Sequence, residues 1–170
     1  MNRGQVMAHK DQVQAAQYQL SLVLGFFPRV DTLLAVLLGL NVAMLGVASA
    51  RAPAPEMLTS IQLLVLTGYL CLTMFSFWNL HRGSFPDTNG GIGSLVYFGE
   101  IAKLQPADYV ERFGSQSEAD FSDALLHQAW RNACILSSKF SSLKKAYLWM
   151  LASVVPWALA LLTFPQEVRA

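Results

Sequence analysis

The sequence is poor in charged residues and in cysteine. Only 14% of its 170 residues are charged and 54% are hydrophobic, whereas soluble domains are about 25% charged and about 45–50% apolar. This composition argues against an ordinary water-soluble globule, and equally against an intrinsically disordered chain. Two cysteines are too few for a disulfide scaffold. The net charge of +1 provides no global basic field for binding nucleic acid.

Signatures of catalysis and of metal binding are missing as well. The three histidines, His9, His81 and His127, do not have the spacing of metal ligands, and Cys71 and Cys134 form no pair motif. The sequence contains no GxSxG or HExxH motif and no carboxylate pair at a reacting distance. We therefore expect no enzymatic activity, no catalytic or metal-binding residue and no cofactor.

The hydrophobic residues are concentrated in three uncharged blocks, at about 32–50, 58–80 and 146–164. A helix rises 1.5 Å per residue, so about 20 residues cross a hydrocarbon core of about 30 Å, and each block is long enough to span a membrane. We predict an all-α integral membrane protein with three transmembrane helices and a helical cytoplasmic unit.

Lysine and arginine indicate the orientation in the membrane. Ten of the twelve lie in the N-terminal arm or in segment 81–145, and the other two are Arg51 and Arg169. Because such residues favour the cytoplasmic side, we predict that the N-terminus and segment 81–145 are cytoplasmic and that the C-terminus is external. The predicted parts are a cytoplasmic amphipathic helix (1–29), a transmembrane hairpin (30–80), cytoplasmic loops and helices (81–145), a third transmembrane helix (146–164) and an external tail (165–170).

Two segments outside the membrane leave alternatives open. The N-terminal arm repeats apolar residues every seven positions and could lie on the membrane surface or pack on the cytoplasmic helices. Residues 81–94 are rich in glycine, proline and asparagine, which predicts a loop. Its glycines at 90, 91 and 93 could be a plain flexible loop or could contact a phosphate, although the full P-loop motif is missing.

A long helix is predicted from about 117 to 164, because no helix-breaking residue occurs between Ser117 and Pro156. Apolar residues along it alternate by three and four, which is typical of a helix that packs on another helix. The partner could be the N-terminal arm, a second copy of the chain, or both. We call this the seam; its members are Leu126, Ala129, Ala133, Leu136, Phe140, Leu143 and Tyr147.

Polar residues within the predicted spans form a second candidate site. Asn41 lies near the middle of span one, and span two carries Gln62, Tyr69, Thr73 and Ser76 on one broad face. These groups could form hydrogen bonds between helices or line an aqueous path through an oligomer. Pro156 in span three could be a hinge or only a packing bend. Span one also repeats small residues that allow close helix approach, at Ala35, Gly39, Ala43, Gly46 and Ala50.

An ordered set of short motifs resembles the effector family of the bacterial Pycsar system, over roughly residues 15–164. The motifs are PRVDT at 28–32, Phe85-Pro86, LVYFGEI at 95–101, Tyr109 and ILSSKF at 135–140. The resemblance implies antiphage defence by a protein of the bacterial inner membrane, paired with a nucleotide cyclase whose cyclic nucleotide triggers damage to that membrane. It implies as partners the lipid bilayer, further copies of the chain, and a cyclic nucleotide or a cognate cyclase or sensor protein, but no nucleic acid.

The resemblance also directs attention to residues that could sense the signal, although a partner protein could read it instead. The candidates are Tyr97, Phe98, Glu100, Lys103, Arg131 and Lys139. The function implied is that of an effector that oligomerises and permeabilises or otherwise impairs the membrane. The alternative is a membrane adaptor without a pore, which recruits a partner through the seam at 126–147.

Overall fold

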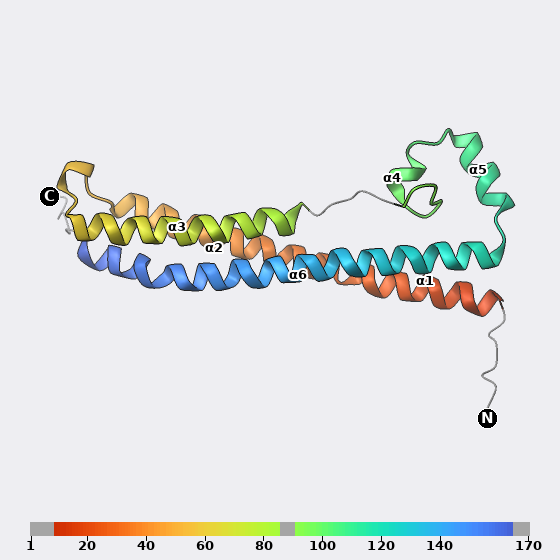
Figure 1. The fold of residues 1–170 in the computed structure, drawn as a ribbon, viewed down its shortest axis with the longest axis horizontal. Helices are drawn as coiled ribbons and strands as arrows, with labels where there is room; N and C mark the ends of the chain where they lie inside the picture. Colours follow the sequence, from red (N-terminus) through yellow and green to blue (C-terminus); the bar gives the residue numbers. More distant parts are fainter. Residues whose placement is uncertain (1–8, 86–90, 165–170) are drawn as a thin grey trace, which may run out of the picture. The chain divides into compact units, whose positions relative to one another are not determined.

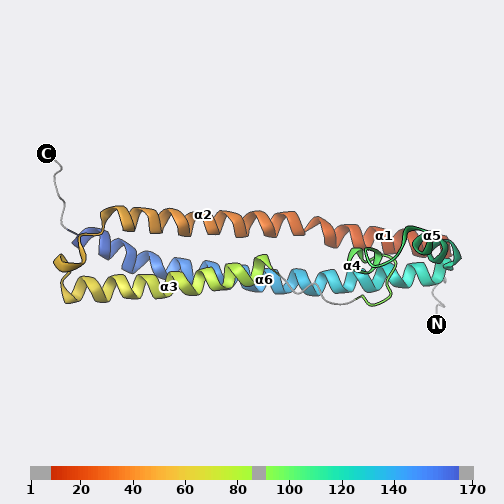
Figure 2. The ribbon, with the colours of Figure 1, turned by 90° about the horizontal axis from the view of Figure 1, so that it is seen from above.

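The computed structural model describes residues 9–85 and 91–164, and within these ranges it contains helices and no strand. Figures 1 and 2 show the ribbon from two directions. The elements are α1 (His9–Gly25), α2 (Phe27–Arg51), the short 3-10 helix η1 (Pro55–Met57), α3 (Ser60–Ser84), α4 (Phe98–Ile101), α5 (Pro106–Ser115) and α6 (Glu118–Thr163). The predicted all-α class is confirmed.

The chain divides into two compact units. Unit 1 comprises residues 1–28 and 87–137, and unit 2 comprises residues 29–86 and 138–170. Helix α6 is a single helix of 46 residues that contributes to both units. The prediction that the third span continues a long preceding helix is therefore confirmed.

Three helical stretches are long and apolar enough to cross a membrane: 11–51, 60–84 and 118–163. Local sequence explains where the helices begin. Pro28 lies in the first turn of α2, where its missing N–H would have had no helical partner. The Thr59 hydroxyl accepts a hydrogen bond from the Gln62 N–H, and the Gln62 side chain accepts one from the Thr59 N–H. These two hydrogen bonds cap the start of α3.

Unit 2 is built from α2, α3 and the C-terminal part of α6. Its apolar core consists of Leu34, Leu37, Leu80, Ala146 and Met150. Close approach of the three helices is helped by the missing side chain of Gly83, since a Cβ there would lie 3.1 Å from Leu34 and 3.2 Å from Ser142. The three helices thus meet around one core at this level.

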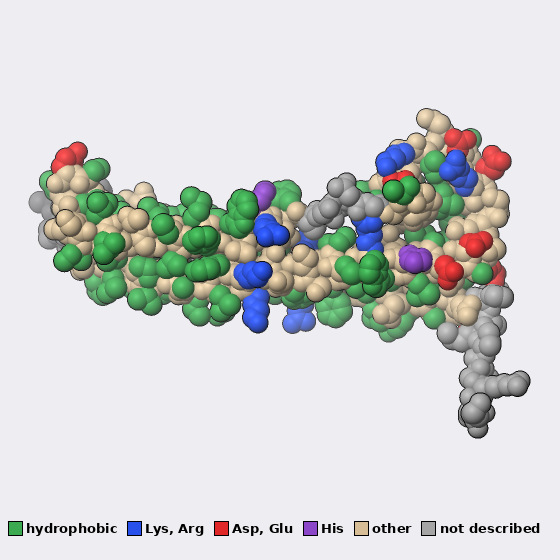
Figure 3. Space-filling model, viewed as in Figure 1, with side chains coloured by type: hydrophobic (Ala, Val, Ile, Leu, Met, Phe, Trp, Pro, Cys, Tyr) green, Lys and Arg blue, Asp and Glu red, His purple; other side chains and the backbone are tan. Residues whose placement is uncertain are grey.

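The outer surface of unit 2 is also apolar. Large hydrophobic side chains such as Val36, Leu64 and Leu162 are exposed on α2, α3 and α6, and Figure 3 shows hydrophobic side chains spread along this part of the chain. A soluble protein would not leave so much apolar surface in water. In a membrane these side chains contact lipid, which accounts for the excess of hydrophobic residues.

An ion pair joins α2 to α6 in unit 2. The Lys139 ammonium donates to the Asp31 carboxylate. The Lys139 side chain is only 6% exposed, whereas that of Asp31 is 52% exposed. The lysine therefore depends on this carboxylate to offset the loss of water around its charge.

Unit 1 contains α1, the short helices α4 and α5, and the N-terminal part of α6. In both views α1 lies beside this part of α6 (Figures 1 and 2). Ala16 of α1 and Leu125 and Ala129 of α6 are buried. The described part of the N-terminal arm, α1, is thus packed on protein, which was one of the two alternatives for the arm.

The predicted seam only partly coincides with the buried stripe of α6. Ala129 is buried and Leu136 and Leu143 are half-buried, but Leu126, Ala133, Phe140 and Tyr147 are exposed. The buried residues of the stripe are spaced by three, four or seven: Ser122, Leu125, Ala129, Asn132, Lys139, Ala146, Met150 and Ser153. The half-buried Leu136 and Leu143 lie in the two gaps of seven. The sequence reading followed large apolar residues, whereas the packed positions include small, polar and ion-paired ones.

We predict that Asp31→Asn destabilises the folded chain, because the buried Lys139 ammonium loses its carboxylate. Breaking a buried pair costs about 3–5 kcal/mol. Since Asp31 is half in solvent, we expect a loss of about 1–3 kcal/mol. The measurement is unfolding of the purified chain in mixed detergent micelles.

Two further variants serve as controls for this prediction. Glu56→Gln changes an exposed carboxylate in η1 and should leave the unfolding midpoint unchanged. Combining Asp31→Asn with Lys139→Met should recover most of the loss, because neither charge then remains. Equal stability of Asp31→Asn and the unmodified chain would contradict the assigned role of the pair.

Candidate functional site

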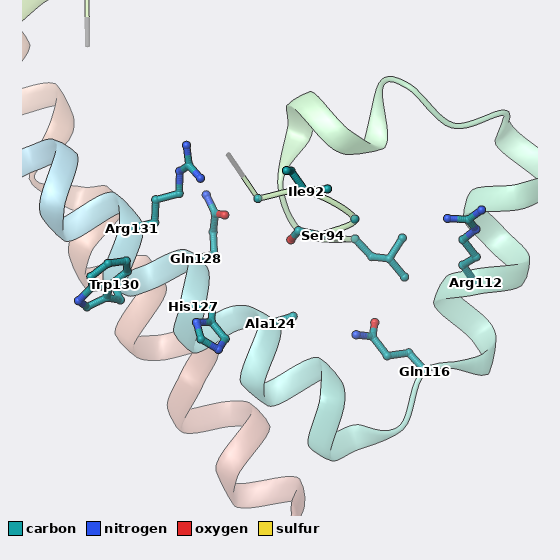
Figure 4. Close-up of a pocket in the computed structure, with 12 residues that line it drawn as sticks. Ile92, Ser94, Arg112, Gln116, Ala124, His127, Gln128, Trp130 and Arg131 are labelled. Carbon is teal, nitrogen blue, oxygen red and sulfur yellow. The ribbon is translucent and has the colours of Figure 1, made fainter. Parts of the chain in front are cut away.

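A cavity of about 530 Å³ lies within unit 1, a size typical of small-molecule sites. Three segments form its wall: the loop 91–95, the C-terminal part of α5 with the residue that follows it, and one face of α6 (Figure 4). Its lining consists of Gly91, Ile92, Gly93, Ser94, Leu95, Arg112, Gln116, Ala124, His127, Gln128, Trp130 and Arg131.

The loop 91–95 owes its shape to two glycines and one carboxylate. Gly91 and Gly93 have φ angles of 74° and 75°, in a region that residues with a Cβ rarely occupy. The Gly93 N–H donates to Glu100 Oε2 over 3.0 Å, and the Ser94 N–H donates to the Gly91 carbonyl over 2.8 Å. The glycines noted in the sequence thus allow a tight loop, and that loop forms one wall of the cavity.

Tyr97 supports the cavity from behind this loop. Its ring is buried, and the Arg131 guanidinium lies 5.4 Å from the ring centroid, within the range of a cation–π interaction. A Cβ on Gly99 would come within 2.8 Å of the same ring, so Gly99 leaves room for it. Tyr97 therefore helps to position Arg131, which lines the cavity.

The cavity favours an anionic ligand. Arg112 from α5 and Arg131 from α6 lie on either side of the loop (Figure 4), and no carboxylate is among the described residues that line it. The Gln116 Oε1 atom is buried without a hydrogen-bond partner in the described part of the chain. Guanidinium groups bind phosphate and carboxylate, and the exposed Trp130 indole offers a flat surface for a ring.

The structure brings together only some of the candidate sensing residues. Tyr97 and Arg131 contact each other, and Glu100 shapes the loop. Phe98 and Lys103 are exposed and are not part of the cavity wall, although Lys103 pairs with Glu100. Lys139 belongs to unit 2, where it pairs with Asp31.

Sequence reasoning missed much of the cavity wall. Arg112, Gln116, Gln128 and Trp130 were not among the candidates, and His127 was considered as a possible metal ligand. On α6, His127, Gln128 and Arg131 recur at the spacing of one helical face, which is a usable signal. Arg112 and Gln116 come from a separate segment, and their proximity depends on tertiary structure.

The polar face of span two lies inside unit 2. Tyr69, Thr73 and Ser76 are buried. Asn41 Nδ2 donates to Ser76 Oγ over 3.2 Å, and Ser76 Oγ donates to the Ala146 carbonyl over 3.0 Å. This face thus forms hydrogen bonds between helices of one chain, and it would line a path only if the helices separated.

Three polar atoms on this face have no hydrogen-bond partner of ordinary geometry among the described residues. They are Asn41 Oδ1, the Tyr69 hydroxyl and the Thr73 hydroxyl. Leaving a buried polar atom unpaired costs about 1–3 kcal/mol. The resting arrangement of unit 2 therefore contains polar groups that water could satisfy.

Two other candidates have local structural roles. Gln62 caps the start of α3, and its Nε2 donates to the Thr163 carbonyl at the end of α6 over 2.7 Å. Pro156 lies inside α6, and the chain stays helical on both sides of it. Because proline has no N–H, the Ala152 carbonyl lacks the usual helical donor at this point.

Comparison with known proteins gives one match. A family model described as the Pycsar effector protein domain, PycTM, matches residues 15–164. A search of curated proteins and a search of solved structures each found no match. The family match covers most of the chain, including the cavity wall and all of the three candidate spans except residues 11–14.

We predict that the loop 91–95 responds to acidic pH through Glu100. Hydrogen bonds from the Lys103 ammonium and the Gly93 N–H hold the pKa of Glu100 below its ordinary value. The stabilisation is thus present above the ordinary carboxyl pKa and is lost as pH falls through the lowered one. An NMR titration of the Gly93 amide should therefore show its midpoint below the ordinary carboxyl pKa.

The variant Lys103→Gln should move this midpoint upward, because it removes the largest contribution to the shift. Lys145→Gln, an exposed lysine of unit 2, serves as a control and should not move it. The prediction fails if the unmodified chain and Lys103→Gln titrate at the same pH.

Proposed function

Because the chain belongs to the Pycsar effector family and is thus an antiphage membrane effector, we propose that unit 1 receives a nucleotide signal. In this proposal the cavity of unit 1 binds the cyclic nucleotide made by a cognate cyclase. Unit 2 then impairs or permeabilises the bacterial inner membrane.

The observation that carries this proposal is the chemistry of the cavity wall. Arg112 and Arg131 provide positive charge without a competing carboxylate, and Trp130 provides a flat surface. A cyclic nucleotide carries one phosphate charge and a flat base, so each part has a matching group. The cavity volume of about 530 Å³ leaves room for such a ligand.

Helix α6 supports coupling of the signal to the membrane. The same helix supplies Arg131 to the cavity and the stretch 138–163 to unit 2. A ligand that binds one arrangement of α6 more tightly shifts the population toward that arrangement. Pro156 offers a point where α6 can bend without losing a further backbone hydrogen bond.

Assembly of several copies is part of the proposal. The small residues Ala35, Gly39, Ala43, Gly46 and Ala50 of α2 are exposed, and beyond their own helix no atom lies within 4 Å of the Cβ position of Gly39 or Gly46. Such a face allows a second helix to approach closely. The exposed seam residues Leu126 and Ala133 provide a second surface for contact in unit 1.

We place the conducting path along the polar face of unit 2 in the opened oligomer. Asn41 Oδ1 and the hydroxyls of Tyr69 and Thr73 are buried without a hydrogen-bond partner of ordinary geometry among the described residues, and water would satisfy these atoms once the helices separate. Hydration of these atoms thereby offsets part of the free energy that is lost when the apolar side chains between the helices separate. The distribution of lysine and arginine supports a cytoplasmic N-terminus and segment 81–145 and a periplasmic C-terminus.

A second candidate function is a membrane adaptor that forms no path. The exposed members of the seam favour it, because Leu126 and Phe140 on α6 are not covered within the chain. A stoichiometric complex with a partner protein, together with silent electrophysiology, would identify the chain as an adaptor.

We predict that Arg112→Gln combined with Arg131→Gln abolishes signal binding and protection against phage. Hydrogen bonds to charged groups contribute about 1.5–3 kcal/mol each, so two losses should weaken binding at least about 100-fold. Calorimetry on the full chain in nanodiscs, with cyclic purine and pyrimidine mononucleotides as probes, measures the affinity. A membrane-potential dye in infected cells measures the effect.

Two controls accompany the double variant. Arg51→Gln removes an arginine at the far end of α2, outside the cavity, and should bind normally. Tyr97→Phe keeps the ring beneath Arg131 and should retain most of the affinity. Normal binding by the double variant, or no depolarisation of cells that also express a cyclase and are infected, would disprove the proposal.

A separate prediction concerns the path through unit 2. Gln62→Leu combined with Thr73→Val should abolish leakage in triggered cells at equal protein level, because the opened path loses polar groups. Thr67→Val on the exposed side of α3 is the matched control and should leak normally. Unchanged leakage of the double variant would leave hydrogen bonding within the bundle as the role of this face.

A further inference from the structure

An apolar groove of about 410 Å³ runs along unit 2 between α2 and α6. Side chains from Leu33 to Leu40 form one wall and side chains from Phe140 to Met150 form the other. Lys144 is the one charged residue among the described residues that line it. The side chains that line the groove are therefore apolar along its length, with Lys144 as the single charged one.

The groove opens to the surroundings of the bundle. Leu33, Leu40, Phe140 and Tyr147 are all exposed, and both helices are candidate membrane spans. From Leu33 to Leu40 the helix rises about 10 Å, roughly a third of the hydrocarbon core. A groove of this length and polarity fits part of one acyl chain.

Basic side chains surround the end of unit 2 where α2 begins and α3 ends. They are Arg29, Arg82, Lys139, Lys144 and Lys145, and the one acidic residue among the described residues at this end is Asp31. Asp31 already pairs with Lys139. The other four are exposed and form no ion pair with any described residue.

From this arrangement we infer that the groove binds an anionic phospholipid. One acyl chain lies between α2 and α6, and the phosphate contacts Lys144 and Arg29. Arg29 lies one helical turn before Leu33 and is thus near the same end of the groove. The butyl stem of Lys144 can follow the apolar wall while its ammonium reaches the headgroup. Basic sites between membrane helices are known to bind such headgroups.

A helix from a second copy fits the groove less well. It would cover Lys144 without supplying a carboxylate at that level. The acidic residues among the described part of unit 2 are Asp31, which is already paired, and Glu56, which lies beyond the opposite end of α2. Burying an unpaired ammonium in hydrocarbon is strongly unfavourable, whereas a lipid phosphate supplies the missing negative charge.

The test is native mass spectrometry of the full chain, released from micelles with added phosphatidylglycerol or phosphatidylcholine. The unmodified chain should retain phosphatidylglycerol in preference. Lys144→Gln should weaken its binding about fivefold, since one basic residue near a lipid surface is worth about 1 kcal/mol. Lys145→Gln, whose side chain does not line the groove, should change it less.

A second variant tests the groove without altering charge. Val36→Trp fills it from an exposed position and should reduce retention of both lipids while the chain stays folded by circular dichroism. Equal retention of both lipids together with no effect of Lys144→Gln would overturn the inference. So would a dimer that Val36→Trp dissociates with no change in bound lipid, because a second copy would then be the occupant. Nucleotide binding in unit 1 is measured separately and does not decide this result.

Discussion

The Ser76 hydroxyl joins all three membrane helices of unit 2. Ser76 belongs to α3, and its hydroxyl accepts a hydrogen bond from the Asn41 side chain of α2. The same hydroxyl donates a hydrogen bond to the Ala146 carbonyl of α6. In hydrocarbon, polar groups have no water to bind, so each must find a partner within the protein. Polar residues such as Asn41, Thr73 and Ser76 therefore face inward, and many large apolar side chains lie on the outside. The apolar core around Leu37 and Met150 packs next to this junction.

The spans and the long helix could be predicted because they depend on local sequence. An uncharged run of about 20 residues specifies a membrane helix almost regardless of its neighbours. The absence of a helix breaker between Ser117 and Pro156 is sufficient to predict most of α6. The family resemblance also rested on short motifs read along the chain, and the match to residues 15–164 confirms it.

Features that depend on packing could not be predicted in the same way. The buried face of α6 is shifted from the seam because Lys139 and Asn132 occupy interior positions, where an apolar pattern would place leucine. Lys139 is paired there with Asp31, and 107 intervening residues separate the two in the chain. The cavity of unit 1 likewise combines Arg112 of α5 with Arg131 of α6, and no spacing in the sequence indicates their proximity.

The half-buried Arg131 and the buried Lys139 of α6 have different kinds of partner, and this bears on how a signal could reach the membrane. Arg131 is held by an aromatic ring and leaves its charge available to the cavity. About two helical turns later, Lys139 is held by a carboxylate and has little exposure.

A ligand at Arg131 competes only with a weak cation–π contact, so it can bind at low cost. A rotation of α6 that broke the Lys139–Asp31 pair would cost about 1–3 kcal/mol, because Lys139 is buried although Asp31 is half-exposed. Two alternative arrangements of α6, with this pair formed or broken, would thus be separated by a real energetic difference. Such a difference would hold most of the population in one arrangement of α6.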